Sequence, residues 1–157
     1  MLVTVLFVFL VAPAQPTTAK TLSSAVRAAC DLAHGIAAKT PGVSIRRRTG
    51  IFRDETLREP VYGCGLDISG SFAKADRTGD AAVRLRDGFS TRGWQEMPAY
   101  SADGTDGTSF AFRKEGVACL VRGTWDGGSD DEPAIPPEDW YKVTLFCTSP
   151  AFAEKRF

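Results

Sequence analysis

The chain has 157 residues, a length typical of one domain. Its 19 Lys and Arg residues balance its 19 Asp and Glu residues, so there is no net charge to attract nucleic acid or an anionic membrane, and neither is expected as a partner. The charge is unevenly placed, because residues 20–94 carry 13 basic against 8 acidic residues and residues 95–157 carry 6 against 11.

The first feature of the chain is an apolar run at residues 2–12. Its length fits the hydrophobic region of a signal peptide and is too short to span a bilayer as a helix. Small residues predict cleavage after Ala14 or after Ala19, although no Lys or Arg precedes the run. We therefore interpret residues 1–19 as a signal peptide and residues 20–157 as one domain. No later run is long enough to cross a membrane, and the mature chain is expected to be periplasmic or secreted.

Residues 21–39 have the pattern of an amphipathic helix. Ser23 or Ser24 can cap its N-terminus, and Pro41-Gly42 is expected to end it. Apolar residues recur at intervals of three and four positions, which places them on one face of a helix. This face comprises Leu22, Val26, Ala29, Cys30, Ala33, Ile36 and Ala37.

Two strands are predicted next, at residues 43–53 and 61–72. Three consecutive arginines, 46–48, lie in the first, and the middle one must face the side opposite to its neighbours. The second alternates, so that Cys64 points to the core, as Cys30 does from the helix. We therefore predict a Cys30–Cys64 disulfide. The apolar face of this strand consists of Tyr62, Cys64, Leu66, Ile68 and Phe72.

A second, shorter helix is predicted at residues 79–92. Asp80 is a candidate N-cap and Gly93 a candidate C-terminal residue, whereas Gly88 weakens the helical pattern. Four strands follow, at residues 97–102, 108–113, 117–125 and 140–148, with a turn at 103–107. Pro98 suits an edge strand because it cannot donate a backbone hydrogen bond.

The register of the last three strands follows from a two-residue turn at Glu115-Gly116. If Cys119 also faces Cys147, the apolar and polar residues sort onto opposite faces, and a slip by one residue would break this sorting. We therefore predict a Cys119–Cys147 disulfide. One face then comprises Phe110, Phe112, Cys119, Val121, Trp125, Tyr141, Val143, Leu145 and Cys147. The other comprises Arg113, Arg122, Thr124, Lys142 and Thr144.

These segments predict an α+β domain. Its antiparallel sheet has about five to six strands, of which the last four form a meander, and one or two helices pack on one face. Two disulfides stabilise it, since an even number of cysteines in a small exported chain is typical of such bonds. No pair has the C-x-x-C spacing of zinc or redox motifs.

The connection between the last two strands, residues 126–139, holds six acidic residues, three prolines and no Lys or Arg. Loops of this length often carry function. The flanking tryptophans could anchor a partner, as aromatic residues do at interfaces. The candidate binding residues are Trp125, Asp126, Asp130, Asp131, Glu132 and Trp140. The alternatives are that the loop is only solvated and that Trp125 and Tyr141 simply close the core.

Catalytic and metal sites have weaker support. His34 is the only histidine, both cysteine pairs are expected to be oxidised, and no nucleophile motif is present. The acids of the connection suit calcium by type, but their spacing matches no calcium loop. We therefore expect no catalytic residue, no metal and no cofactor.

The sequence favours a non-enzymatic exported binding protein of the bacterial envelope. Such a protein would be an inhibitor or accessory factor of an envelope protein, with residues 125–140 as its contact surface. The alternative is a small cell-envelope hydrolase or glycan-binding protein that uses the carboxylates of the same loop. The sequence sets neither the partner nor the oligomeric state.

Overall fold

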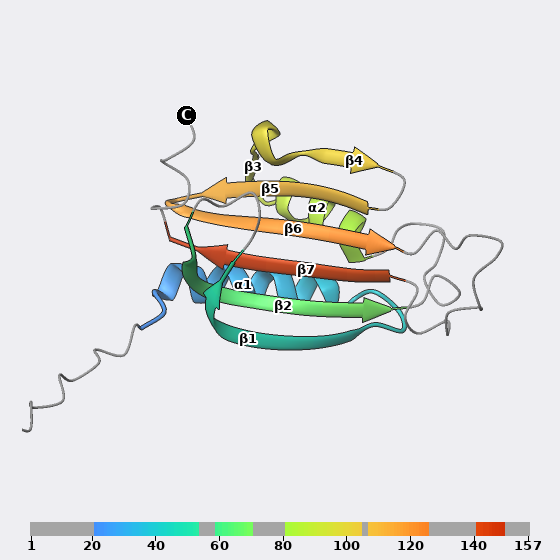
Figure 1. Ribbon diagram of the computed structural model, residues 1–157, viewed down its shortest axis with the longest axis horizontal. Helices are drawn as coiled ribbons and strands as arrows, with labels where there is room; N and C mark the ends of the chain where they lie inside the picture. Colours follow the sequence, from blue (N-terminus) through green and yellow to red (C-terminus); the bar gives the residue numbers. More distant parts are fainter. Residues whose placement is uncertain (1–20, 54–58, 71–80, 105–106, 126–140, 150–157) are drawn as a thin grey trace, which may run out of the picture.

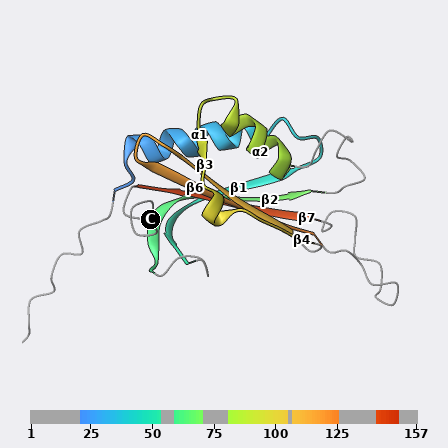
Figure 2. The same ribbon diagram turned by 90° about the horizontal axis from the view of Figure 1, so that it is seen from above.

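The computed structural model describes residues 21–53, 59–70, 81–104, 107–125 and 141–149, and every structural statement below refers to these ranges. A seven-stranded antiparallel sheet carries two helices, both on the same face (Figures 1 and 2). This is the predicted α+β architecture. The interpretation of residues 1–19 as a signal peptide lies outside the described residues. Neither described helix is long and apolar enough to cross a membrane.

Helix α1, Ser24–Ala37, confirms the first predicted helix. Its cap is Ser23, whose side-chain oxygen accepts a hydrogen bond from the backbone N–H of Val26 at 3.3 Å. This bond satisfies one of the N–H groups that have no partner within the helix. The predicted apolar face is the buried one and packs on the sheet, with its buried members at Val26, Ala29, Cys30, Ala33, Ile36 and Ala37.

Helix α2, Ala81–Ser90, packs beside α1 on the sheet. Gly93 follows it with a φ of 73°, a left-handed conformation that favours glycine and is typical of a helix C-terminus. The predicted cap Asp80 lies outside the described residues. Gly88, which weakened the sequence pattern, lies where the helices meet, and a Cβ atom added there would be 2.6 Å from Cδ1 of Ile36. The glycine therefore permits the close contact of α1 with α2.

The strand order in the sheet is β1-β2-β7-β6-β5-β3, and the short strand β4 also pairs with β5 (Figure 1). Strands β4 to β7 thus form the predicted C-terminal meander. The seven strands are β1 (Ser44–Phe52), β2 (Val61–Gly70), β3 (Gln95–Glu96), β4 (Ala102–Gly104), β5 (Gly107–Lys114), β6 (Val117–Trp125) and β7 (Tyr141–Thr148).

The predicted register of β5, β6 and β7 is confirmed. Phe112 faces Cys119, and Cys119 faces Cys147. The turn between β5 and β6 has positive φ angles at Glu115 (47°) and Gly116 (76°), as a two-residue hairpin turn of type I′ requires. The apolar set, apart from the Trp125 side chain, which lies outside the described part of the structure, belongs to the core under the helices, and alternation places the polar set on the opposite face.

The strand predicted at residues 97–102 is wrong. Pro98–Tyr100 forms a short 3-10 helix, η1, and the strands β3 and β4 lie on either side of it. Pro98 begins this turn because proline lacks the N–H that a strand would use and has a φ that suits the start of a helix. Both flanking strands pair with β5, so this edge of the sheet consists of two short pieces.

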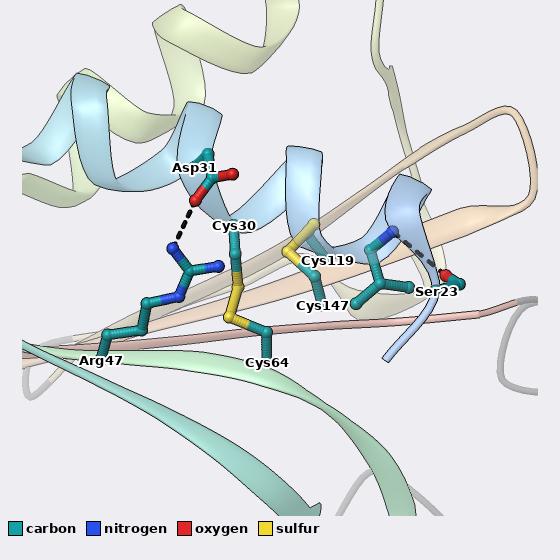
Figure 3. The surroundings of a disulfide bond; sticks show 8 residues. Ser23, Cys30, Asp31, Arg47, Cys64, Cys119 and Cys147 are labelled. Carbon is teal, nitrogen blue, oxygen red and sulfur yellow. Dashed lines mark hydrogen bonds and ion pairs between the residues drawn. A yellow bond between two sulfur atoms is a disulfide. The ribbon is translucent and has the colours of Figure 1, made fainter. Parts of the chain in front are cut away.

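Both predicted disulfides are present (Figure 3). Cys30–Cys64 links the middle of α1 to β2, with a Cα–Cα distance of 6.3 Å, and Cys119–Cys147 links β6 to β7, with 4.1 Å. All four cysteines are fully buried between the helices and the sheet. The disulfides therefore bind the helical layer to the sheet and fix neighbouring strands in the core.

Candidate interaction surface

Most of the contact surface predicted from the sequence falls outside the described residues. This applies to Asp126, Asp130, Asp131, Glu132 and Trp140. Trp125 ends β6, and its backbone pairs with Tyr141, the first residue of β7. The acidic segment therefore leaves and rejoins the sheet at adjacent positions. Its role in binding stays a prediction.

The sheet face opposite the helices, here called the helix-free face, is the most distinctive surface that the structure describes (Figure 2). Side chains that alternate with the core residues line it. One polar row crosses five neighbouring strands and consists of Arg46, Asp67, Thr144, Arg122 and Ser109. A second row beside it contains Ser69, Lys142 and Thr124. The polar part of this face thus carries three basic side chains from these rows against one carboxylate.

Asp67 forms ion pairs with two basic side chains at the β1 end of this face. Its Oδ2 atom lies 3.2 Å from Nη2 of Arg46 and 3.1 Å from Nε of Arg48. The Arg46 side chain is 81% exposed, that of Arg48 49%, and that of Asp67 26%. Exposed ion pairs contribute only about 0.2–1 kcal/mol to stability. The cluster of two guanidinium groups and one carboxylate therefore does little to hold the fold together.

Arg47 points the other way, as the alternation of a strand requires, and pairs with Asp31 of α1 (Figure 3). This confirms the prediction that the middle arginine differs in direction from its neighbours. The three arginines therefore have different roles. Arg47 connects β1 to the helical layer, whereas Arg46 and Arg48 present charge on the helix-free face.

An aromatic platform lies next to the arginine cluster. The guanidinium carbon of Arg48 is 4.6 Å from the ring centroid of Phe52, a cation–π distance. Phe52 stacks on Phe146 of β7, with the ring centroids 5.5 Å apart. The ring can cross β2 because residue 65 is glycine, where an added Cβ would be 2.5 Å from Cε1 of Phe52. The platform therefore holds Arg48 against an apolar support.

The two rings of the platform belong to a buried apolar cluster on the helix-free face. This cluster contains Phe52, Met97, Tyr100, Ala111, Ala118, Leu120 and Phe146. It is separate from the larger core under the helices. Each member of this cluster is at most 7% exposed, so the surface that this face offers to a partner consists of its polar and charged side chains, among them Arg46 and Arg48.

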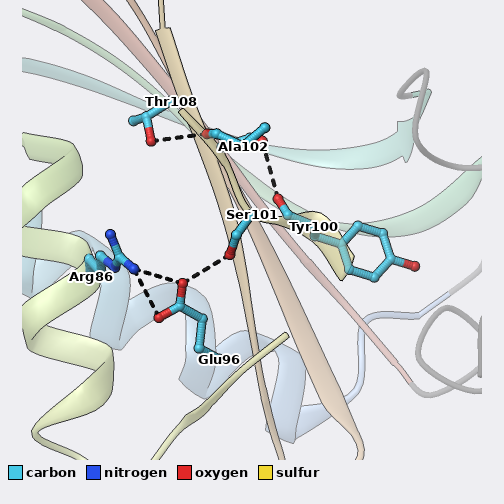
Figure 4. Close-up of polar contacts among 7 residues, drawn as sticks. Arg86, Glu96, Tyr100, Ser101, Ala102 and Thr108 are labelled. Carbon is cyan, nitrogen blue, oxygen red and sulfur yellow. Dashed lines mark hydrogen bonds and ion pairs between the residues drawn. The ribbon is translucent and has the colours of Figure 1, made fainter. Parts of the chain in front are cut away.

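A further polar cluster lies on the helix side, between α2 and the β3 edge (Figure 4). Glu96 accepts hydrogen bonds from Arg86 at 3.0 Å and from Ser101 at 2.9 Å. Arg86 also lies 5.8 Å from the ring centroid of Phe110. These contacts connect α2 to β3 and to Ser101, the residue that follows η1. They therefore have a structural role at this edge of the sheet.

The only histidine of the chain and the potential metal ligands of the described ranges can be located in the structure. His34 is exposed in the last turn of α1. Within these ranges, no three His, Cys, Asp or Glu side chains lie close enough together to hold a metal ion. What the described side chains can do is bind anionic groups through guanidinium hydrogen bonds, which are strong when the acceptor is charged.

Sequence reasoning missed the shared carboxylate of the arginine cluster. Asp67 is 21 residues from Arg46 in the chain, and only the register of β1 with β2 brings them together. The one available signal was an acidic residue on the polar face of the second predicted strand, opposite a strand with three arginines. The chain matches no protein-family model, no curated protein and no solved structure.

Proposed function

We propose that the protein is a non-enzymatic binding protein, periplasmic or secreted, that acts as an inhibitor or accessory factor of an envelope protein. The observation that carries this proposal is the contrast between the two sheet faces. Helices cover one face, and the other exposes Arg46 and Arg48, of which Arg48 lies against the buried ring of Phe52. Arginine is enriched in protein interfaces.

The two disulfides support the proposed location. Disulfides persist in oxidising compartments outside the cytoplasm and are rare within it. Cys30–Cys64 and Cys119–Cys147 account for all four cysteines. Together with the apolar run at residues 2–12, they favour an exported chain.

Residues 125–140 remain part of the proposed contact surface. The segment joins β6 to β7 and contains six of the acidic residues of the chain. Its charge is opposite to that of the arginine cluster, so the two surfaces would contact parts of a partner with different charges. Charge complementarity of this kind sets specificity and the rate of association.

A pull-down from envelope extract tests this function. The baits are the tagged mature protein, the Asp130→Ala/Asp131→Ala/Glu132→Ala variant, and an Arg27→Gln/Lys39→Gln control, which changes one exposed residue of α1 and one in the turn that follows it. We expect the wild type and the control to enrich the same protein and the acidic variant to lose it. Equal capture by all three baits would remove residues 125–140 from the contact surface. No specific capture by any bait would contradict the binding function.

The alternative is a small hydrolase or glycan-binding protein that acts through the carboxylates of residues 125–140. Single variants separate it from the main proposal, since one carboxylate would then be essential for turnover or glycan binding and the others would matter little. A protein contact would instead weaken gradually as Asp130, Asp131 and Glu132 are neutralised, and its salt dependence would fall. The measurement is turnover or binding of cell-envelope glycans by each single variant.

A further inference from the structure

The outer edge of β1 is a long strand edge. Among the described strands, β1 pairs only with β2 and lies at one end of the sheet (Figure 1). Its nine residues pair with β2 in unbroken register from Ser44 to Phe52. Alternate residues of such an edge direct their N–H and C=O groups away from the sheet. An extended segment of another chain can therefore pair with it, as in β-strand addition.

The opposite edge of the sheet is built differently. There, β3 has two residues and β4 has three, and the 3-10 helix η1 separates them. Short, interrupted edge strands are a usual way to prevent pairing with other chains. The β1 edge lacks this interruption and is longer than the common strand of about five to six residues. Unlike the opposite edge, the β1 edge is therefore long and continuous, as pairing with a strand of a partner requires.

The charges on β1 specify the kind of segment that fits. Arg46 and Arg48 extend on the helix-free face, where Arg46 donates a hydrogen bond to Oδ2 of Asp67 and Arg48 forms an ion pair with the same oxygen. A guanidinium has five N–H donors, so one contact to a shared carboxylate leaves donors for a further carboxylate. Two positive charges against one negative charge leave the cluster positive. It therefore favours an anionic partner.

A second copy of β1 is a poor occupant of the same edge. If two β1 strands paired antiparallel about Arg47, Arg46 of each would face Arg48 of the other, and Arg47 would face Arg47. Like charges directly opposite each other destabilise a strand pair. The arginines thus act against self-pairing and in favour of acidic segments.

We propose that the β1 edge binds an acidic, extended segment of a partner protein, which adds to the sheet as a further strand. Acidic side chains at alternate positions would share the face of Arg46 and Arg48, because a strand repeats every two residues. The intervening residue would lie on the side of Arg47, whose charge Asp31 already balances. This proposal rests on the proposed binding function and adds the edge and the chemistry of the partner.

Peptide binding tests the proposal. The probe is a peptide of about ten residues, the length needed to span β1, in which Glu alternates with Thr. A matched peptide carries N-methyl groups on alternate backbone amides, which keeps the charge but prevents strand pairing. We expect the mature wild-type protein to bind the first peptide and to lose at least tenfold in affinity for the second. Equal binding of both peptides, or binding of neither, would overturn the strand addition.

Variants of the protein test the role of charge. Arg46→Gln/Arg48→Gln should lower the affinity for the alternating peptide at least tenfold, whereas Arg27→Gln/Lys39→Gln, with the same loss of charge on α1 and the turn that follows it, should change it less than twofold. Arg46→Lys/Arg48→Lys should recover part of the loss. Thermal unfolding verifies that each variant is folded. An unchanged affinity in the Gln variant would overturn the assignment to these arginines.

Three further results would identify another occupant. Arg46-dependent binding of a sulfated polysaccharide that exceeds binding of the peptide would replace the protein partner with a polyanion. Self-association that is lost both in Arg46→Gln/Arg48→Gln and in Asp130→Ala/Asp131→Ala/Glu132→Ala would replace it with a second copy. Capture of an envelope protein that is insensitive to Arg46→Gln/Arg48→Gln would leave the binding function intact and overturn only the use of the β1 edge.

Discussion

Cys64 and Cys147 are directly opposite each other across β2 and β7, yet each is bonded to a different cysteine. Cys147 also faces its own partner, Cys119, on the other side, so three cysteines form one row across three strands. The Cα atoms of Cys119 and Cys147 are 4.1 Å apart, which indicates a narrow, non-hydrogen-bonded strand pair. The backbone groups of Cys147 then point to β2, and Cys64–Cys147 is a wide pair of about 5.5 Å.

This row predicts an alternative disulfide. A Cα distance of about 5.5 Å lies within the range for disulfides, so Cys64 and Cys147 should bond to each other when their native partners are absent. The Cys30→Ala/Cys119→Ala variant should therefore contain no free thiol after oxidation, as measured by thiol titration and intact mass. The matched Cys64→Ala/Cys119→Ala variant should keep two free thiols, because Cys30 and Cys147 are not paired in the structure. Two free thiols in the first variant would contradict the prediction.

Gly88 and Gly35 should respond in opposite ways to the same substitution. Gly35 lies in α1 with no atom within 4 Å of an added Cβ, so Gly35→Ala should stabilise the protein by about 0.5–1 kcal/mol through helix propensity. At Gly88 the added Cβ would be within 3 Å of three side-chain atoms of Ile36, and overpacking costs about 1–3 kcal/mol. Urea unfolding should therefore rank Gly88→Ala well below Gly35→Ala. In an Ile36→Ala background, Gly88→Ala should instead stabilise.

Gly65 should be needed for the aromatic platform. An added Cβ would lie 2.5 Å and 2.7 Å from two atoms of the Phe52 ring, so Gly65→Ala should displace the ring from Phe146 and cost about 1–3 kcal/mol. Gly50, in β1, has no atom within 4 Å of an added Cβ, and Gly50→Ala serves as the control. Urea unfolding gives the stability, and near-ultraviolet circular dichroism reports the aromatic packing. A full-strength aromatic signal in Gly65→Ala would refute the role of the glycine.

Ser23 should act as the helix cap, and its neighbour should not. Ser23→Ala removes the oxygen that binds the N–H of Val26 and should cost about 1 kcal/mol. Ser24 is the first residue of α1, so Ser24→Ala should have almost no effect or should stabilise slightly. Equal losses in the two variants, measured by urea unfolding, would show that the side-chain hydrogen bond contributes nothing.

The sequence was most informative where two independent patterns agreed. In β5, β6 and β7, the two-residue alternation and the spacing of Cys119 and Cys147 admit one register, and the structure has it. The position of Cys30 on the apolar helix face and of Cys64 on the core face similarly predicted their bond. Each pattern alone would have left several alternatives open.

Other features depend on contacts that no local pattern encodes. The pairing of β2 with β7 follows from the path of the whole chain, and without it Cys64 could not be placed beside Cys147. The 3-10 helix at Pro98 replaced a strand because both flanking segments pair with β5. The same distinction applies to the candidate site. The acidic segment was evident from the composition of the sequence, whereas the contact of Asp67 with two arginines could be seen only in the folded structure.

The order of the cysteines in the chain has a consequence for how the protein matures. The first cysteine bonds to the second, and the third to the fourth. When a chain enters an oxidising compartment N-terminus first, each cysteine therefore meets its native partner before any later one emerges. Vectorial delivery thus avoids the Cys64–Cys147 mispairing that refolding of the complete reduced chain would permit. For a chain delivered in this way an oxidase alone should suffice, whereas refolding of the complete reduced chain in vitro should benefit from a disulfide isomerase.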